Sequence, residues 1–137
     1  MLYSVLDEKL KIGEKYRCGA HSPQHEHLLV IFEDDGETGY FYALDLHQKA
    51  QPVVDSLFVY AVSDIDKNSL AEPRDLQICW SENGYQAFLL INGYPHAVFD
   101  FHQFVGYNHS KYPEPNFESM WVHKETTQEL VNQWLMR

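Results

Sequence analysis

Two Asn-Gly pairs divide the middle of the chain into three short apolar runs, and no other feature constrains the fold as strongly. The pairs are Asn83-Gly84 and Asn92-Gly93, and the runs they separate are residues 76–81, 85–91 and 94–101. Asn-Gly between β-rich runs is typical of a two-residue type I′ hairpin turn, because both turn positions adopt positive φ. The sequence therefore predicts a three-stranded antiparallel meander.

The turns also predict how the strands of the meander pair. A two-residue turn at Asn92-Gly93 places Leu89 opposite His96, and the preceding turn places Leu89 opposite Ile78. This face is the more apolar one, so we expect it to be the core face, with His96 and Asp100 on it. The other face is only half apolar, and a helix or loop should cover part of it, over Phe88, Leu90 and Phe99.

Further elements flank the meander. Residues 28–44 read as a hairpin with Asp35-Gly36 as its turn, which would lay the ring of Phe32 over Gly39. More strands are expected at residues 52–62 and 118–123, with a short one at 10–13. Thr126 and Glu129 form a capping box that opens a helix ending near Met136. The expected fold is α+β, made mainly of antiparallel hairpins with a C-terminal helix.

Length, composition and charge bound the kind of protein. The chain has 137 residues, of which 45% are hydrophobic and 15% aromatic, so a single domain over residues 1–137 with a real core is expected. The net charge is −10, with only 10 Lys and Arg, scattered along the chain. Nucleic acids and anionic membranes bind clustered cations, so neither is an expected partner. A basic protein partner fits this charge, and so does a simple role in solubility.

The N-terminal residues and the cysteines point to the cytoplasm. Residues 1–8 carry acid where a signal peptide carries base, and no run of residues is apolar enough to span a membrane. Cys18 and Cys79 match no metal or redox spacing. Two lone thiols suit a reducing compartment.

The segment of residues 102–117 is the first candidate for a binding site. It is long, contains two prolines and holds four aromatic residues, Phe104, Tyr107, Tyr112 and Phe117. Loops of this length often carry function. The alternative is that the four rings cap the half-apolar face of the meander. The next candidate is the acidic hairpin tip, where a cation site or docking edge competes with ordinary turn chemistry at Asp34, Asp35 and Glu37.

Histidines supply the candidates for catalysis and metal binding. The chain has no GxSxG, HExxH, P-loop or GxGxxG motif. A small hydrolase could use His96 as its base, supported by Asp100, His102 or Glu33, whereas the alternative is a core histidine bonded to its surroundings. His21, His25 and His27 form a weak metal-binding pattern, opposed by Pro23 and by the alternation of a strand. No metal or cofactor is therefore predicted.

Two sequence blocks resemble a known family. They are FEDDGETGYFYA at residues 32–43 and INGYPHAVFDF at residues 91–101. Both are similar to blocks in a family of small bacterial proteins known only as a domain of unknown function, and the likeness runs from about residue 28 to 123. It implies a bacterial cytosolic protein and brings no catalytic residue. The function is left between an acidic binding protein, for example of an inhibitor or immunity type, and a small hydrolase or metal-dependent enzyme. The oligomeric state is left open.

Overall fold

The computed structural model describes residues 2–136 and contains ten strands, one α-helix and two short 3-10 turns in that range. The 3-10 turns are η1 (Val62–Asp64) and η2 (Lys67–Ser69). The strands and the helix are β1 (Leu2–Leu10), β2 (Tyr16–His21), β3 (Leu28–Asp34), β4 (Thr38–Asp45), β5 (Val53–Ala61), β6 (Arg74–Ser81), β7 (Gln86–Ile91), β8 (Tyr94–Asp100), β9 (Val105–Asn108), β10 (Val122–Glu125) and α1 (Gln128–Leu135).

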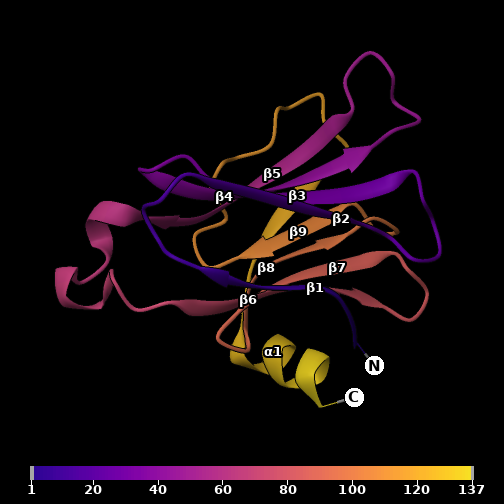
Figure 1. Cartoon of the computed structure of the whole chain (residues 1–137). Coiled ribbons are helices and arrows are strands. Elements are labelled where there is room, and N and C mark those ends of the chain that lie inside the picture. The colour runs from indigo at the N-terminus through magenta and orange to yellow at the C-terminus, as the bar shows by residue number, and fades with distance from the viewer. Residues whose placement is uncertain (1, 137) are drawn as a thin grey trace.

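The strands form two sheets that lie face to face (Figure 1). One has six strands in the order β1-β6-β7-β8-β9-β10, and the other has four in the order β2-β3-β4-β5. Every pairing is antiparallel except that of β9 with β10. The predicted α+β class, with mainly antiparallel sheet and a C-terminal helix, is confirmed. No helix within residues 2–136 has the length and apolar character needed to cross a bilayer.

The main core lies between the two sheets. Phe32 and Phe41 enter it from the four-stranded sheet, and Trp80 and Phe99 enter it from the six-stranded sheet. The rings of Phe41 and Phe99 stack across the interface with centroids 5.2 Å apart. One cluster of buried side chains thus joins both sheets and holds them in a fixed arrangement. A cleft between the sheets can therefore open only at their ends, outside this cluster.

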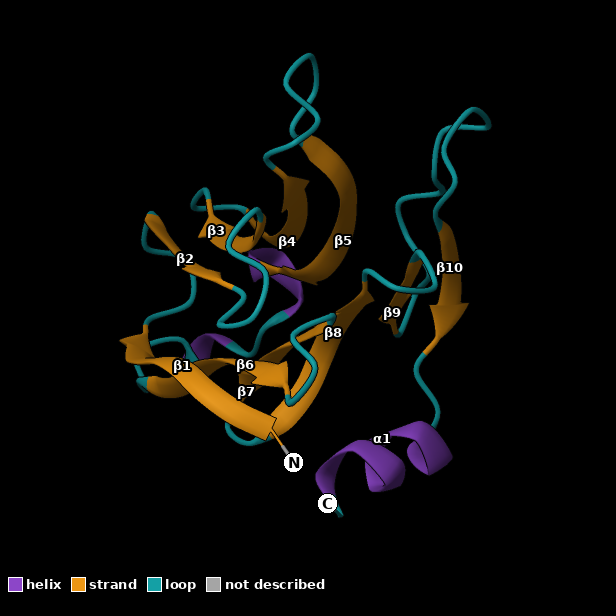
Figure 2. Cartoon of the chain, turned by 90° about the vertical axis from the view of Figure 1, so that its right-hand side faces the viewer, coloured by secondary structure: helices purple, strands orange, loops and turns teal. Residues whose placement is uncertain are grey.

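Helix α1 covers the outer face of the six-stranded sheet (Figure 2). Its Trp134 ring packs edge-on against Phe88 and Tyr107, at centroid distances of 5.6 and 5.4 Å. The expectation that a helix or loop covers part of this face is confirmed for Phe88 and Leu90, whereas Phe99, which was predicted to lie on the same face, is in the main core. The cap is shifted by one residue from the predicted Thr126, because the hydroxyl of Thr127 accepts the first backbone N–H bond, from Leu130 at 3.2 Å.

The predicted pairing of β7 with β8 was wrong beyond its first two residues. Leu90 pairs with Pro95 and Leu89 with Ala97, so His96 is the extra residue of a β-bulge. Pro95 has no N–H to donate, and bulges are where a sheet tolerates proline. The bulge reverses the faces of β8: Ala97 and Phe99 point into the core, whereas His96, Val98 and Asp100 lie on the outer face.

The turn of the β3–β4 hairpin is shifted by one residue from its predicted place. Asp34 pairs with Gly39 and the N–H of Asp35 donates to the carbonyl of Thr38 at 3.1 Å, so the two turn residues are Gly36 and Glu37, and Phe32 lies opposite Phe41 instead of Gly39. The ring that covers Gly39 belongs to Tyr60, the partner of Gly39 on β5. A Cβ at position 39 would lie 2.7 Å from that ring, so the glycine is required by close packing.

Other segments differ from their predicted boundaries. Strand β1 extends over residues where no strand was predicted, and residues 11–14 form a turn instead of the expected strand at 10–13. The supposedly irregular segment 102–117 contains β9, and the last strand is β10 instead of residues 118–123. The irregular part of the segment is therefore the connection between β9 and β10, residues 109–121.

Candidate functional site

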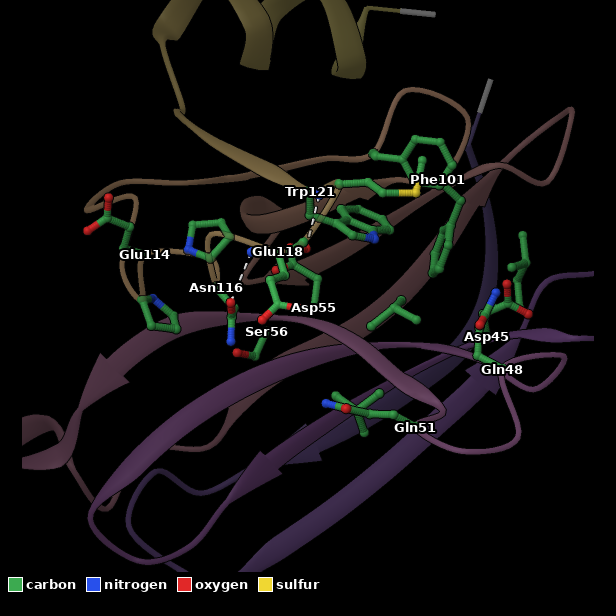
Figure 3. Close-up of a pocket in the computed structure, with 18 of the residues that line it drawn as sticks. Asp45, Gln48, Gln51, Asp55, Ser56, Phe101, Glu114, Asn116, Glu118 and Trp121 are labelled. Carbon is green, nitrogen blue, oxygen red and sulfur yellow. Dashed lines mark hydrogen bonds between the residues drawn. The ribbon is translucent and has the colours of Figure 1, made fainter.

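A cleft of about 820 Å³ opens where the ends of the two sheets meet. Figure 3 shows Asp45 and Gln48 at one end of it, Glu114 at the other, and Asp55, Ser56 and Glu118 between them. Two of its walls come from the four-stranded sheet and from the connection of residues 109–121, hereafter the crossover loop. A volume of this size suits a small ligand or a few residues of a peptide.

The cleft has an aromatic wall built from the six-stranded sheet and the crossover loop. Trp121 lies edge-on to Phe99, Phe101 and Phe104, with ring centroids 5.5 to 5.7 Å apart. Phe101, Phe104 and Trp121 line the cleft. Because Phe101 and Trp121 are buried and packed in this cluster, that wall is held rigidly in place.

The base of the crossover loop is anchored by buried hydrogen bonds. The Asn108 side-chain amide donates to the backbone oxygens of Phe58 and Tyr112, both at 2.9 Å, and its oxygen accepts the N–H of Lys111 at 2.7 Å. The N–H of Phe58 donates to the carbonyl of Tyr112 at 2.9 Å. Asn108 is almost fully buried, so these bonds tie the loop firmly to β5.

A buried ion pair joins the two sheets beside this anchor. His123 Nε2 lies 2.8 and 2.9 Å from the two carboxylate oxygens of Asp55, and Nδ1 lies 3.0 Å from the carbonyl of Lys111. The His123 and Asp55 side chains are only 2% and 5% exposed. A Cβ at Gly106 would come within 2.9 Å of the carboxylate, so the glycine is what lets β9 pass this close.

Both ring nitrogens of His123 face acceptors, so the arrangement favours the doubly protonated ring. Burial alone would lower the pKa of His123, but the Asp55 hydrogen bond and charge, with the carbonyls of Lys111 and Pro113, outweigh it and raise that pKa. Burial raises the pKa of Asp55, and the His123 partner offsets this only in part. The pair is therefore a fixed bridge in one wall of the cleft.

The four aromatic residues predicted as a binding site divide into two groups. Phe104 packs on Trp121 beside the cleft, and Tyr107 packs under Trp134 on the outer face. Tyr112 and Phe117 lie on the crossover loop and are 57% and 94% exposed. Met120, on the same loop, is 70% exposed. The four rings therefore do not form a common cap, and the exposed ones stand on the loop that walls the cleft.

Two carboxylates of the acidic hairpin tip already accept hydrogen bonds from protein groups, most of them backbone N–H groups. The Asp34 carboxylate is buried and accepts hydrogen bonds from Gly13, Gly36 and the Tyr60 hydroxyl at 2.6 to 2.8 Å. Asp35 accepts the N–H groups of Glu37 and Thr38 at 2.9 Å, and these bonds lower its pKa. The structure thus gives Asp34 and Asp35 turn and anchoring roles, and only Glu37 of the three has no such bond among the described residues.

The proposed catalytic residues do not converge on one point. The half-buried ring of His96 lies against Tyr94 and His109, at centroid distances of 5.0 and 6.2 Å. Burial, with the nearby His109, lowers the pKa of His96 to about 4. Asp100 instead accepts the backbone N–H groups of His102 and Gln103 and the side-chain amide of Gln86. His96 lies outside the lining of the cleft described above.

The His21, His25 and His27 pattern is also split up. His21 Nδ1 lies 2.8 Å from the carbonyl of Glu26, and His25 Nε2 lies 3.0 Å from the carbonyl of Asn83. The ring of His27 lies near that of His25, with centroids 6.2 Å apart, and it also meets two residues from the end of β4 and the turn after it. One donor atom each from His27, Asp45 and His47 lie within 4.8 Å of one another.

Sequence reasoning missed Asp45, His47 and Asp55, and it did not connect His123 with Asp55. The first two follow the apolar run of β4 as Asp-Leu-His, a spacing that would have merited attention beside His27. Asp55 is an acid inside a β-rich run, which is a signal for a buried partner. Nothing in the sequence, however, shows that its partner is 68 residues away on β10.

Two comparisons with other proteins place this chain in a wider group. Residues 10–135 match the family described as "Uncharacterized protein conserved in bacteria (DUF2251)". An uncharacterized protein of Haemophilus influenzae is 55% identical over 135 residues, covering 98% of this chain and 83% of that protein. No solved structure shows significant similarity.

Proposed function

Since the chain belongs to this family of uncharacterized bacterial proteins, its function has to come from its own geometry, and we propose that it is a binding protein whose cleft receives a positively charged segment of a protein partner. The observation that carries the proposal is the charge of the cleft lining. It includes the carboxylates of Asp45, Asp55, Glu114 and Glu118 and no Lys or Arg side chain.

The four carboxylates differ in what they offer a ligand. The charge of the Asp55 carboxylate is balanced by His123, so Asp55 is not free to pair with a ligand. Glu114 and Glu118 are exposed, and neither side chain forms an ion pair with a described residue. A Lys or Arg side chain entering the cleft could pair with them while its methylene stem packs on the aromatic wall. The net charge of −10 would also speed the approach of a basic partner.

The crossover loop offers apolar contacts next to these charges. Tyr112, Phe117 and Met120 expose large apolar side chains on one loop, and exposed apolar groups that cluster commonly mark interaction surfaces. Aromatic residues and Met are enriched at the centres of protein interfaces. The loop is tied down at its base by Asn108 and His123, so binding would order only its tip.

The test is binding of basic peptides to the purified full chain in the presence of a chelator. Isothermal titration should show tighter binding of Lys- and Arg-containing peptides than of acidic or neutral peptides with the same apolar residues. The affinity should fall as salt rises. Intrinsic tryptophan fluorescence should change in the same titration, because Trp121, one of the three tryptophans, lies in the cleft wall.

Matched charge variants distinguish binding in the cleft from a general attraction between the acidic protein and a basic peptide. Glu114→Gln with Glu118→Gln should weaken binding of the basic peptide by about tenfold, which corresponds to about 1.4 kcal/mol. Glu72→Gln with Glu125→Gln removes the same charge from exposed positions outside the cleft lining and should leave binding nearly unchanged. Equal losses in both pairs, or no preference for basic peptides, would contradict the proposal.

A further inference from the structure

We propose that His27, Asp45 and His47 form a binding site for a single divalent transition-metal ion of the zinc type, at the end of the cleft farthest from Glu114. The three residues come from adjacent places in the four-stranded sheet. His27 immediately precedes β3, Asp45 is the last residue of β4, and His47 lies in the turn that follows. Leu28 pairs directly with Asp45, so the two strand ends bring the three side chains together.

Backbone hydrogen bonds fix the positions of these residues. The N–H of Leu46 donates to the carbonyl of His27 at 2.8 Å, and the N–H of Asp45 donates to that of Pro52, also at 2.8 Å. One Asp45 oxygen accepts the N–H of His47 at 3.0 Å. The other Asp45 oxygen takes no hydrogen bond from a described residue, so it is available as a ligand.

The histidine nitrogens at this site also lack protein partners. No hydrogen bond between described residues involves a ring nitrogen of His27 or His47, whereas His21, His25 and His123 each place one against a backbone carbonyl. The His27 and His47 rings stack with centroids 4.0 Å apart and an angle of 3° between their planes. Two imidazoles that lie this close, with ring nitrogens that have no protein partner among the described residues, suit a shared metal ion.

The distances require only a local adjustment. The three donor atoms lie within 4.8 Å of one another, and bonds of ~2.0–2.2 Å around one tetrahedral ion place donors about 3.4 Å apart. In stacked rings the nitrogen lone pairs lie in parallel planes, so one ring must turn for the lone pairs to converge on one ion. His47 is exposed and lies in a turn, so its ring can make that rotation.

The donor set also selects the class of ion. Two imidazoles with one carboxylate suit zinc and its transition-metal neighbours, whereas magnesium and calcium prefer oxygen ligands. Three protein ligands leave a fourth position of a tetrahedral ion open. His27 and Asp45 line the cleft, so a donor group of the cleft's occupant could reach that position. This inference goes beyond the proposed function, because it concerns the protein alone.

The test is titration of the tag-free full chain with ZnCl₂ by isothermal calorimetry at neutral pH, without any peptide. We expect binding of one ion per chain and no comparable heat with MgCl₂ or CaCl₂. His47→Gln, His27→Gln and Asp45→Asn should each weaken zinc binding more than about tenfold, since even outer-shell partners cost ~10–100-fold. Addition of Co²⁺ should give visible absorption bands that the His47→Gln variant lacks.

Control variants show whether zinc binds at the proposed site or at other histidines or cysteines of the chain. His21→Gln and His109→Gln each remove an exposed histidine elsewhere and should leave zinc affinity unchanged, and Cys18→Ser tests a thiolate ligand in the same way. His47 is exposed, so its variant should fold, which circular dichroism and thermal unfolding without metal will check. The proposal is overturned if wild type does not bind zinc, if His47→Gln binds it equally well, or if a control variant loses binding.

Discussion

The buried Asp55–His123 bridge gives the sharpest quantitative prediction. Removing one partner leaves the other buried without a partner, which typically costs ~3–5 kcal/mol of folding stability. We therefore expect Asp55→Ala and His123→Ala each to lower the free energy of unfolding by that amount. An unfolding entropy of ~2.1 cal/mol/K per residue over this chain converts the loss into a fall in Tm of about 10–17 °C. Urea unfolding followed by circular dichroism, with calorimetry, measures both quantities.

Two further variants separate charge from hydrogen bonding in the bridge. In Asp55→Asn the amide can donate to Nε2 of a neutral His123, whose Nδ1–H still reaches the Lys111 carbonyl. That variant should therefore lose only about 1–2 kcal/mol, the difference between charge-assisted and neutral hydrogen bonds. The double variant Asp55→Ala with His123→Ala should lose less than the sum of the single losses, because no unpaired group is left.

The same bridge predicts a pH dependence with a definite sign. The folded-state pKa of His123 is raised, so its stabilising contribution is complete below its ordinary pKa of ~6.5 and is lost as the pH rises through the raised value. Wild type should lose stability over that range, and Asp55→Asn should not. Additive single losses, an Asp55→Asn cost as large as that of Asp55→Ala, or a flat wild-type profile above neutral pH would each refute this account.

Two other positions have equally specific expectations. Gly39→Ala places a Cβ against the Tyr60 ring and should cost about 1–3 kcal/mol of stability in urea unfolding, as overpacking does; an unchanged midpoint would contradict the close contact. NMR titration of His96 should give a pKa of about 4. The contribution of the neutral buried ring to folding stability is therefore complete above the ordinary histidine pKa of ~6.5 and is lost as the pH falls toward 4. A midpoint near 6.5 would show that the ring is solvated.

The strand pairings next to the Asn-Gly turns could be predicted from the sequence, because they depend on local turn residues. Asn92 and Gly93 have φ values of 50° and 79°, as a type I′ turn requires, and this turn sets the first pairs of β8. The register of β6 with β7 also matches the prediction from the other Asn-Gly pair, but the turn itself differs: Gly84 has positive φ and Asn83 does not, and the N–H of Gly84 donates to the carbonyl of Ser81, so this turn is not of type I′. The half-apolar face of the meander also indicated that a helix or loop would cover part of it, and Trp134 does so.

The errors come from interactions that the local pattern does not contain. A single extra residue at the β8 bulge moved His96 off the core face, although Pro95 inside an expected central strand was a signal for it. Strand β1 is mostly exposed and its apolar residues do not alternate regularly with polar ones, so its sequence pattern does not mark it as a strand, and its pairing with β6 defines it instead. The cleft joins residues from strand ends, turns and the crossover loop, so only the tertiary structure could assemble it.

The parallel pairing of β9 with β10 has a consequence for how this protein can vary. Adjacent parallel strands cannot be joined by a tight turn, so the chain needs residues 109–121 to return to the same end of the sheet. Removing the return path would break the edge of the sheet, whereas changes confined to its tip would leave the anchors at Asn108 and His123 intact. Sequence change can therefore accumulate at the tip, which makes this segment a natural place to engineer or diversify specificity without redesigning the scaffold.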